Sequence, residues 1–212
     1  MPLYLWLKKQ QLLLKAPTQI NITMQKQQLR DTYSKKRSEL SVQERSKFDD
    51  LLLIQFQRLP FKKVQVVLSF WPMEQRAEMD THLYTRYLSY LIPSAKFCYP
   101  VIDPSSNFMD AFEVNNDTEF EENKYGITEP VNGVKIDPLE VDFIIMPLFA
   151  FDEKGYRVGY GKGYYDRFIA RCKPNVITVG VSYFEAVDKV DDTHHYDVPL
   201  KYCITPYKVY EF

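Results

Sequence analysis

The fold of this chain is decided by residues 142–172, DFIIMPLFAFDEKGYRVGYGKGYYDRFIARC. The apolar run from Phe143 to Phe151 predicts a buried strand, and the apolar residues from Tyr164 onward recur with the one-sided spacing of a helix. Three glycines at alternate positions, Gly159, Gly161 and Gly163, separate the two. The order of strand, glycine-rich connection and helix predicts an α/β protein.

The glycine loop, defined here as residues 159–163, predicts a binding site for an anion. Glycine allows the backbone to approach a ligand closely, and free N–H groups beside a helix N-terminus attract negative charge. Lys162 adds a full positive charge in the middle of the loop. We therefore expect a phosphate chain here. Asp166, in the first turn of the helix, places a carboxylate beside those phosphates, which suggests Mg²⁺.

Two familiar phosphate-binding motifs do not match the glycine loop. A Walker A loop needs Ser or Thr after its lysine, and a glycine follows Lys162; the dinucleotide fingerprint needs a third glycine where Tyr164 stands. The remaining alternative is a plain turn, with Lys162 solvated and Asp166 serving as an N-terminal helix charge. The density of Arg157, Lys162, Asp166 and Arg167 in one short turn favours a binding site.

The composition indicates a single domain without a general nucleic-acid surface. The chain has 212 residues, and its 27 basic and 28 acidic residues nearly cancel. The three cysteines form no CxxC pair, which is typical of reduced thiols and predicts a cytoplasmic protein. We expect no membrane partner, no zinc site, and a monomer or small homo-oligomer.

Residues 1–23 are expected to be a loosely ordered extension that precedes an α/β domain of residues 24–212, with Met24 as an alternative start. Their apolar run comes before the lysines, the reverse of the order in a secretory signal. An apolar surface helix is the rival interpretation.

The rest of the chain alternates helical patterns with short apolar runs. Helices are expected over residues 25–39 and from a capping box at Ser41 and Glu44 to Leu59. Asp80 and Thr81 can cap a further helix, which carries apolar residues on one face from Leu83 to Leu91. The acidic run 117–122 is expected to be a solvated loop. Further strands are predicted at residues 64–71, 96–102, 108–114, 176–182 and 207–212. The pattern predicts one three-layer domain, a largely parallel sheet flanked by helices on both faces.

The run from Leu148 to Arg167 resembles the signature of the 5-formyltetrahydrofolate cyclo-ligases, also called methenyltetrahydrofolate synthetases. Three further places resemble this family in the expected order: residues 26–30, residues 78–81, and residues 196–200 with 204–205 near the end. The chain departs from the family at Tyr160, where some members carry Arg. The resemblance implies a NagB/RpiA/CoA-transferase-like fold. It also implies ATP- and Mg²⁺-dependent conversion of 5-formyltetrahydrofolate to 5,10-methenyltetrahydrofolate through an imidate phosphate.

The resemblance also implies roles for individual residues. Lys162 and Arg157 would be catalytic, stabilising the transferring phosphoryl group, and Asp166 and Asp197 would hold the metal. ATP would contact Lys26, Arg30, Arg157, Gly159, Gly161, Lys162, Gly163 and Tyr164. The folate would contact Glu78, Phe70, Tyr160, Tyr164 and Tyr165.

From the residues alone, several of these positions keep simpler interpretations. Lys26 and Arg30 lie on one side of a helix, where they can meet one phosphate chain or form a solvated face with the other basic residues of that helix. Phe70 can be a core residue, and Glu78 an ordinary charge before a helix. Two rival functions also remain: a nucleotide- or polyphosphate-binding module without turnover, and a sugar-phosphate isomerase with Glu129 or Asp152 as general base.

Overall fold

The computed structural model describes residues 23–103 and 105–212. The expectation for the N-terminal extension therefore lies outside the described residues, except at Thr23. Thr23 and Met24 form the short strand β1 (Thr23–Met24), which pairs in parallel with β12 (Lys189–Val190). Close to the predicted boundary, the chain is thus joined to a segment far along the sequence.

An eight-stranded sheet forms the centre of the molecule, in the order β14-β13-β11-β8-β2-β3-β4-β7. The five strands from β13 to β3 run parallel, and β14, β4 and β7 add antiparallel edges, so the prediction of a largely parallel sheet is confirmed. The strands are β2 (Val66–Leu68), β3 (Lys96–Asp103), β4 (Phe108–Val114), β7 (Val134–Ile136), β8 (Phe143–Met146), β11 (Ile177–Val181), β13 (Tyr202–Ile204) and β14 (Val209–Glu211).

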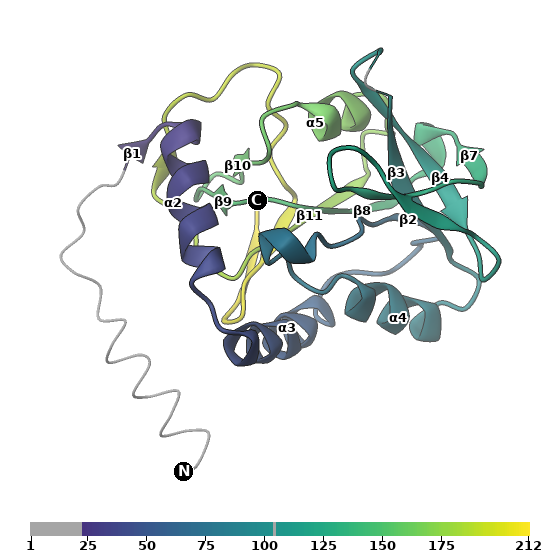
Figure 1. The fold of residues 1–212 in the computed structure, drawn as a ribbon, viewed down its shortest axis with the longest axis horizontal. Helices are drawn as coiled ribbons and strands as arrows, with labels where there is room; N and C mark the ends of the chain where they lie inside the picture. The colour runs from purple at the N-terminus through teal and green to yellow at the C-terminus, as the bar shows by residue number, and fades with distance from the viewer. Residues whose placement is uncertain (1–22, 104) are drawn as a thin grey trace, which may run out of the picture.

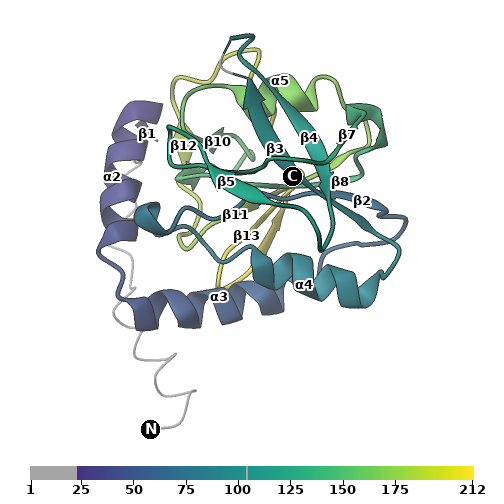
Figure 2. The same ribbon diagram turned by 45° about the vertical axis from the view of Figure 1, so that its right-hand side comes forward.

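Helices cover both faces of this sheet. The helices α3 (Val42–Phe56) and α4 (His82–Leu91) lie below it in the view of Figure 1, and α5 (Tyr164–Ile169) lies above it. The turned view shows the same three layers (Figure 2). Side chains of β8 alternate between the two cores: Phe143 and Ile145 pack with the α3 and α4 side chains, whereas Ile144 and Met146 pack with those of α5. All four are fully buried, as expected of a central parallel strand.

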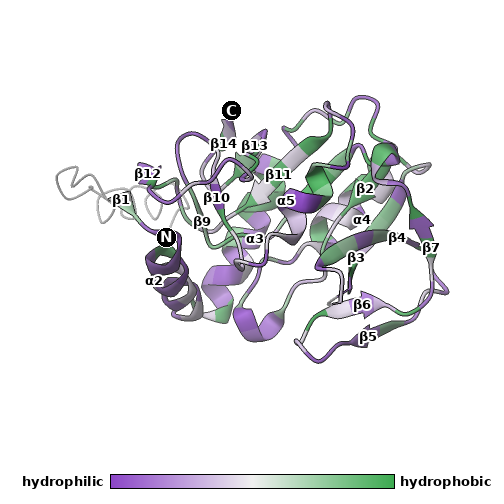
Figure 3. Cartoon of the chain, turned by 90° about the horizontal axis from the view of Figure 1, so that it is seen from above, coloured by the Kyte–Doolittle hydropathy of each residue, from purple (hydrophilic) through white to green (hydrophobic). Residues whose placement is uncertain are grey.

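The helix α2 (Lys26–Ser38) lies at the side of the sheet rather than on a face of it. It is largely hydrophilic (Figure 3), and its buried Leu29 packs against Ala150, Val158 and Val190. This small cluster holds α2 against a hairpin of β9 (Ala150–Phe151) and β10 (Arg157–Val158).

The local signals for helix starts are largely confirmed. The Ser41 hydroxyl accepts a hydrogen bond from the Glu44 N–H, and the Glu44 carboxylate accepts one from the Ser41 N–H at 2.9 Å, which is the predicted capping box. At the start of α4, Asp80 Oδ1 accepts from the His82 N–H at 3.0 Å. Thr81 instead donates its hydroxyl to the Phe70 carbonyl, so it ties the helix to the end of β2.

Three expectations about elements were wrong. The apolar run 143–151 forms two strands, because Pro147 between them cannot donate to a sheet. The glycine-loop helix ends at Ile169 instead of Cys172. The acidic run 117–122 contains β5 (Phe120–Glu122), which pairs with β6 (Thr128–Pro130). The short 3-10 helices η1 (Glu74–Arg76) and η2 (Pro138–Glu140) complete the fold.

Asp49 on α3 gives the fold a measurable dependence on pH. Its Oδ1 accepts the Tyr183 hydroxyl at 2.9 Å, but burial outweighs this bond and raises its pKa to about 6. The folded state then holds the proton more tightly than the unfolded state does. The stability from this group is present below the unfolded pKa of 3.8 and is lost as the pH rises through 6.

We therefore expect Asp49→Asn to stabilise the protein more at pH 7.5 than at pH 4.5. The expected difference in free energy of unfolding is about 1–2 kcal/mol, less than the full linkage because the side chain is partly exposed. Urea unfolding at both pH values measures it, with the exposed neighbour Asp50→Asn as the control. An equal effect of Asp49→Asn at the two pH values would contradict the raised pKa.

Candidate functional site

The glycine loop lies where the connections after two neighbouring parallel strands meet. It joins β10 to α5, downstream of β8, whereas Glu78 belongs to the connection that follows β2, the strand that pairs with β8. Ligand sites in α/β sheets form at this carboxyl edge. Two of the loop glycines have left-handed backbones, with φ of +85° at Gly161 and +67° at Gly163, as a cradle of N–H groups requires. Because α5 has only six residues, its dipole adds little to that cradle.

Two cations belong to the surroundings of the glycine loop, Arg30 of α2 and Lys162 of the loop itself. Arg30 Nε donates to the Gly159 carbonyl at 2.8 Å, so the guanidinium lies against the backbone of the loop. Lys162 is exposed, and its ammonium has no ion pair or hydrogen bond in the described part of the chain. Arg167 stabilises the loop backbone by donating a hydrogen bond to the Lys162 carbonyl at 2.8 Å. The loop is thus braced while Lys162 stays available for an anion.

Gly161→Ala should disturb both the backbone and Arg30. A Cβ there would lie 3.1 Å from Arg30 Nη2, on a backbone whose φ disfavours any side chain. We expect a loss of about 1–2 kcal/mol in the free energy of unfolding and weaker binding of an anion to the loop. Gly159→Ala is the matched control, because its Cβ would meet nothing closer than the Pro147 carbonyl at 4.0 Å. Similar unfolding free energies for the two variants would contradict this description of the loop.

Arg157 and Asp166 form a partly buried ion pair beside the glycine loop. The guanidinium donates to Asp166 Oδ1 at 2.9 Å and to the Val198 carbonyl at 2.7 Å, and the Arg157 side chain is only 6% exposed. Asp166 Oδ1 also accepts the Val198 N–H at 3.1 Å. The pair therefore joins the start of α5 and the strand before the loop to Val198.

A second ion pair joins α2 to the same segment. Lys26 Nζ lies 2.6 Å from Asp197 Oδ2, which also accepts the His194 N–H at 2.6 Å. Although partial burial acts in the opposite direction, these two contacts hold the pKa of Asp197 below its ordinary value. Asp197 is thus ionised at neutral pH. The Lys26 N–H donates to Asp192 Oδ1, which anchors the first residue of α2.

The two predicted metal ligands, Asp166 and Asp197, could bind Mg²⁺ together with waters or substrate phosphates. Residues 23–103 and 105–212 contain no cluster of three metal-ligating side chains. Mg²⁺ usually takes one or two carboxylates together with waters and substrate phosphates, so a larger cluster is not required. The contacts described above use Oδ1 of Asp166 and Oδ2 of Asp197, which leaves the other oxygen of each carboxylate for a ligand. The Asp166 contact with the Val198 N–H brings the two segments together.

Glu78 and Tyr160 form the polar group at the other end of the glycine loop. Tyr160 donates its hydroxyl to Glu78 Oε1, and the Met73 N–H donates to Oε2 at 2.8 Å. Glu78 is 7% exposed, and burial raises its pKa although these two hydrogen bonds act to lower it. The buried Tyr165 hydroxyl has no hydrogen-bond partner within the described residues. Burial, together with the nearby Glu78 charge, raises the pKa of Tyr165, so it stays a neutral donor.

The remaining predicted folate contacts have different surroundings. Phe70 is 5% exposed and belongs to the core shared with α3 and α4, so its ring packs the interior. Tyr164 is half-buried, with the Arg167 guanidinium 5.4 Å from its ring centroid. Trp71, next to Phe70, is half-buried and packs against Phe120 at 4.6 Å between ring centroids.

Sequence reasoning missed two arginines at this site. Arg37 on α2 is 3% exposed, and its Nη2 donates to the Tyr160 hydroxyl at 3.4 Å. Arg76 on η1 lies over the ring of Tyr160, 4.7 Å from its centroid. Arg37 follows Arg30 by two helical turns, and that spacing was the available signal. Arg76 had no such signal, because only the fold brings η1 to the loop.

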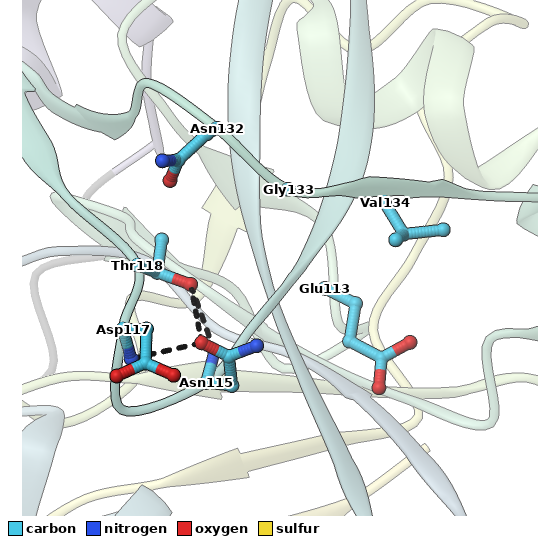
Figure 4. Close-up of a pocket in the computed structure, with 7 residues that line it drawn as sticks. All are labelled: Glu113, Asn115, Asp117, Thr118, Asn132, Gly133 and Val134. Atoms are coloured by element: carbon cyan, nitrogen blue, oxygen red, sulfur yellow. Dashed lines mark hydrogen bonds between the residues drawn. The ribbon is translucent and has the colours of Figure 1, made fainter.

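A pocket elsewhere in the molecule does not involve these residues. It is lined by Glu113, Asn115, Asp117, Thr118, Asn132, Gly133 and Val134 (Figure 4). The Asn115 side chain accepts from the Asp117 N–H at 2.9 Å, and Asn132 accepts from the Glu119 N–H at 3.2 Å. These polar groups stabilise the turns that carry them.

No helix in the described part of the chain is long and apolar enough to span a membrane.

The fold and this site define an α/β protein with a cationic glycine loop at the carboxyl edge of a parallel sheet. A sequence model described as the 5-formyltetrahydrofolate cyclo-ligase family matches residues 22–206. The chain therefore belongs to that family.

Known relatives agree with this assignment. The 5-formyltetrahydrofolate cyclo-ligase of Haemophilus influenzae is 38% identical over 106 residues, 48% of this chain and 56% of that protein. The Escherichia coli K12 enzyme is 34% identical over 118 residues, 53% of this chain and 64% of that one. In these alignments the chain thus spans between about half and two thirds of the relatives' length.

Solved structures extend the likeness over most of the chain. The structure of Aquifex aeolicus 5,10-methenyltetrahydrofolate synthetase superimposes with a TM-score of 0.73 and 32% identity, over 89% of this chain and 93% of that one. A 5,10-methenyltetrahydrofolate synthetase from Mycoplasma pneumoniae has a TM-score of 0.66 and 22% identity, over 85% of this chain and 98% of that one, and supports the fold alone.

Proposed function

We propose that this protein converts 5-formyltetrahydrofolate to 5,10-methenyltetrahydrofolate, with ATP as co-substrate and Mg²⁺ as cofactor. The observation that carries the proposal is the arrangement of two different binding groups on one loop. Lys162 offers an available cation for phosphate, and Tyr160, two residues earlier, is bonded to the buried acceptor Glu78. A ligand that spans the loop would place its phosphates near Lys162 and a polar heterocycle near Glu78.

The chemistry requires activation of a poor electrophile. The formyl group of the substrate is an amide, so its oxygen attacks the γ-phosphorus of ATP and ADP leaves. The imidate phosphate that results has an activated carbon, to which N10 adds with loss of its proton. Inorganic phosphate then departs with the former formyl oxygen, which leaves the methenyl bridge. Phosphoryl transfer of this kind depends mainly on positioning and on cations near the transferring group.

The phosphate end of the site supplies those cations. Lys162 reaches the transferring phosphoryl group, because its ammonium is not engaged by the protein. Arg30, held against the loop, and Lys26 contact the rest of the phosphate chain. Arg157 acts by holding Asp166, which with Asp197 would bind Mg²⁺. The metal supplies charge neutralisation of the phosphate oxygens when it is bound.

The folate end of the site supplies hydrogen bonds. Glu78 accepts from the N–H and amino groups of the pterin, which present adjacent donors. Tyr160 keeps one carboxylate oxygen of Glu78 in place. The Tyr165 hydroxyl, buried and without a partner in the described residues, donates to a ligand acceptor.

The two rival functions have less support. An isomerase would need a free general base, but Glu129 Oε1 accepts the Ile102 N–H at 2.8 Å, and Asp152, 1% exposed, accepts three backbone N–H groups. Both carboxylates therefore hold the backbone. A nucleotide-binding module without turnover would need the glycine loop and its cations but would leave the Glu78 and Tyr160 pair without a role.

Oxygen-18 in the formyl group tests the proposed chemistry against mere nucleotide binding or ATP hydrolysis. We expect the label to appear in inorganic phosphate, with one ADP for each methenyl product, as measured by mass spectrometry. ADP formation with unlabelled phosphate in the presence of the folate would contradict the proposal.

Further expectations belong to the same proposal. They are the NagB/RpiA/CoA-transferase-like fold, a cytoplasmic location, and a monomer or small homo-oligomer. Light scattering of the purified protein tests the last of these.

A further inference from the structure

Arg37 is the one residue in the basic run at the end of α2 whose side chain turns inward. Lys35 and Lys36 beside it are exposed, as a solvated helix face predicts, whereas Arg37 is 3% exposed. An arginine is always ionised, and burying its charge is costly unless other groups compensate it. A buried Arg37 therefore calls for a role.

The direct contacts of Arg37 compensate its charge poorly. Nη1 donates to the Leu148 carbonyl and Nη2 to the Tyr160 hydroxyl, both at the long distance of 3.4 Å. The guanidinium also lies 4.7 Å from the centroid of the Phe149 ring. Nε has no hydrogen-bond partner, and Arg37 forms no ion pair among the residues that the structure describes. The Arg37 guanidinium thus lies near a carboxylate but forms no ion pair with it.

That carboxylate is Glu78, one hydrogen bond further along. Tyr160 accepts from Arg37 and donates to Glu78 Oε1, so the three side chains form a relay from α2 through the glycine loop to the connection after β2. The other groups facing Glu78 are the Met73 N–H, Arg76 of η1 and the Tyr165 hydroxyl of α5. Arg37 is the buried cation of this set; Arg76 is exposed to solvent, which screens it.

We propose that Arg37 is a positioning residue for the proposed reaction, which orients Tyr160 and keeps Glu78 ionised so that the carboxylate can accept the donors of the substrate heterocycle. The inference rests on the proposed function but concerns a buried residue that lies outside the proposed ATP and folate contacts. Glu78 is buried, and burial favours its protonated form. Loss of the nearby positive charge would favour that form further, and a protonated Glu78 accepts fewer hydrogen bonds.

The test has one readout that depends on activity and one that does not. In Arg37→Met, kcat/KM for the folate should fall about tenfold at neutral pH, and the acid limb of its pH profile should move up by about one unit. The KM for ATP should stay unchanged. Arg37→Lys should restore most of the activity because it keeps the charge. Lys36→Met, on the exposed face of the same helix, is the control and should behave as wild type.

The second readout is the titration of Glu78 itself in the free protein. Carbon-13 NMR of carboxyl-labelled glutamate follows it, with Glu78→Gln to assign the signal. We expect its pKa to rise in Arg37→Met by about one unit, and Arg37→Gln is the substitute if the methionine variant does not fold. An unchanged Glu78 titration in a folded neutral variant would overturn the relay. A raised pKa in a protein whose wild type shows no turnover would support the relay and reject the proposed function.

Discussion

Lys162→Ala is expected to lower kcat/KM by about 10²–10³-fold, the largest effect of any single change at the phosphate end of the site. The ammonium is the one group of the glycine loop that can follow charge as it develops on the transferring phosphoryl group. The side chain is exposed and has no partner in the described residues, so its removal costs the fold little. We expect the free energy of unfolding to change by less than about 0.5 kcal/mol.

Steady-state kinetics and urea unfolding measure the two effects on the same preparation. Lys154→Ala is the matched control, because Lys154 is an exposed lysine in the turn between β9 and β10. It should retain wild-type activity. If Lys162→Ala kept near-normal turnover, the glycine loop would lose its proposed role in phosphoryl transfer.

Glu78→Gln is expected to lower kcat/KM for the folate by about 10²-fold while leaving the fold equally or more stable. The amide has the shape of the carboxylate but presents one acceptor and one donor, so an N–H of the substrate would face a wrong partner. Burial raises the pKa of Glu78, so the ionised side chain opposes folding at pH 7.5 and its neutral replacement does not. Activity and stability should therefore change in opposite directions.

Substrate kinetics and unfolding at pH 7.5 separate these effects. Glu74→Gln provides the control, because Glu74 is exposed on η1, four residues earlier. The KM for ATP should change little in either variant. A Glu78→Gln protein with wild-type folate kinetics, or one that is clearly less stable than wild type, would contradict the role assigned to this buried carboxylate.

Local patterns predicted the parts of the fold that depend on neighbouring residues. The capping box at Ser41, the buried run of β8 and the helix after the glycine loop were all readable, because each rests on a short-range rule of spacing or capping. The small separate sheet of β5 and β6 was harder to predict. β5 and β6 pair through short polar segments, which have no periodicity to distinguish them from a loop.

The site was predictable as a set of candidates but not as a network. The motif identified Arg157 and Asp166, yet it did not show that they bind each other, because that contact depends on how the β9–β10 hairpin meets α5. In the same way, the pairing of Lys26 with Asp197 joins residues 171 positions apart. Arg37 was grouped with the solvated basic residues of its helix, and only the docking of α2 buries it.

The most direct test of the whole account is the ATP-dependent appearance of the methenyl chromophore. Purified protein is mixed with 5-formyltetrahydrofolate, Mg²⁺ and ATP, and absorbance is followed against a control without ATP. We predict a rise in absorbance that requires ATP and is strongly reduced in Lys162→Ala. A folded protein that binds ATP but gives no rise would contradict the assignment of this substrate to the site.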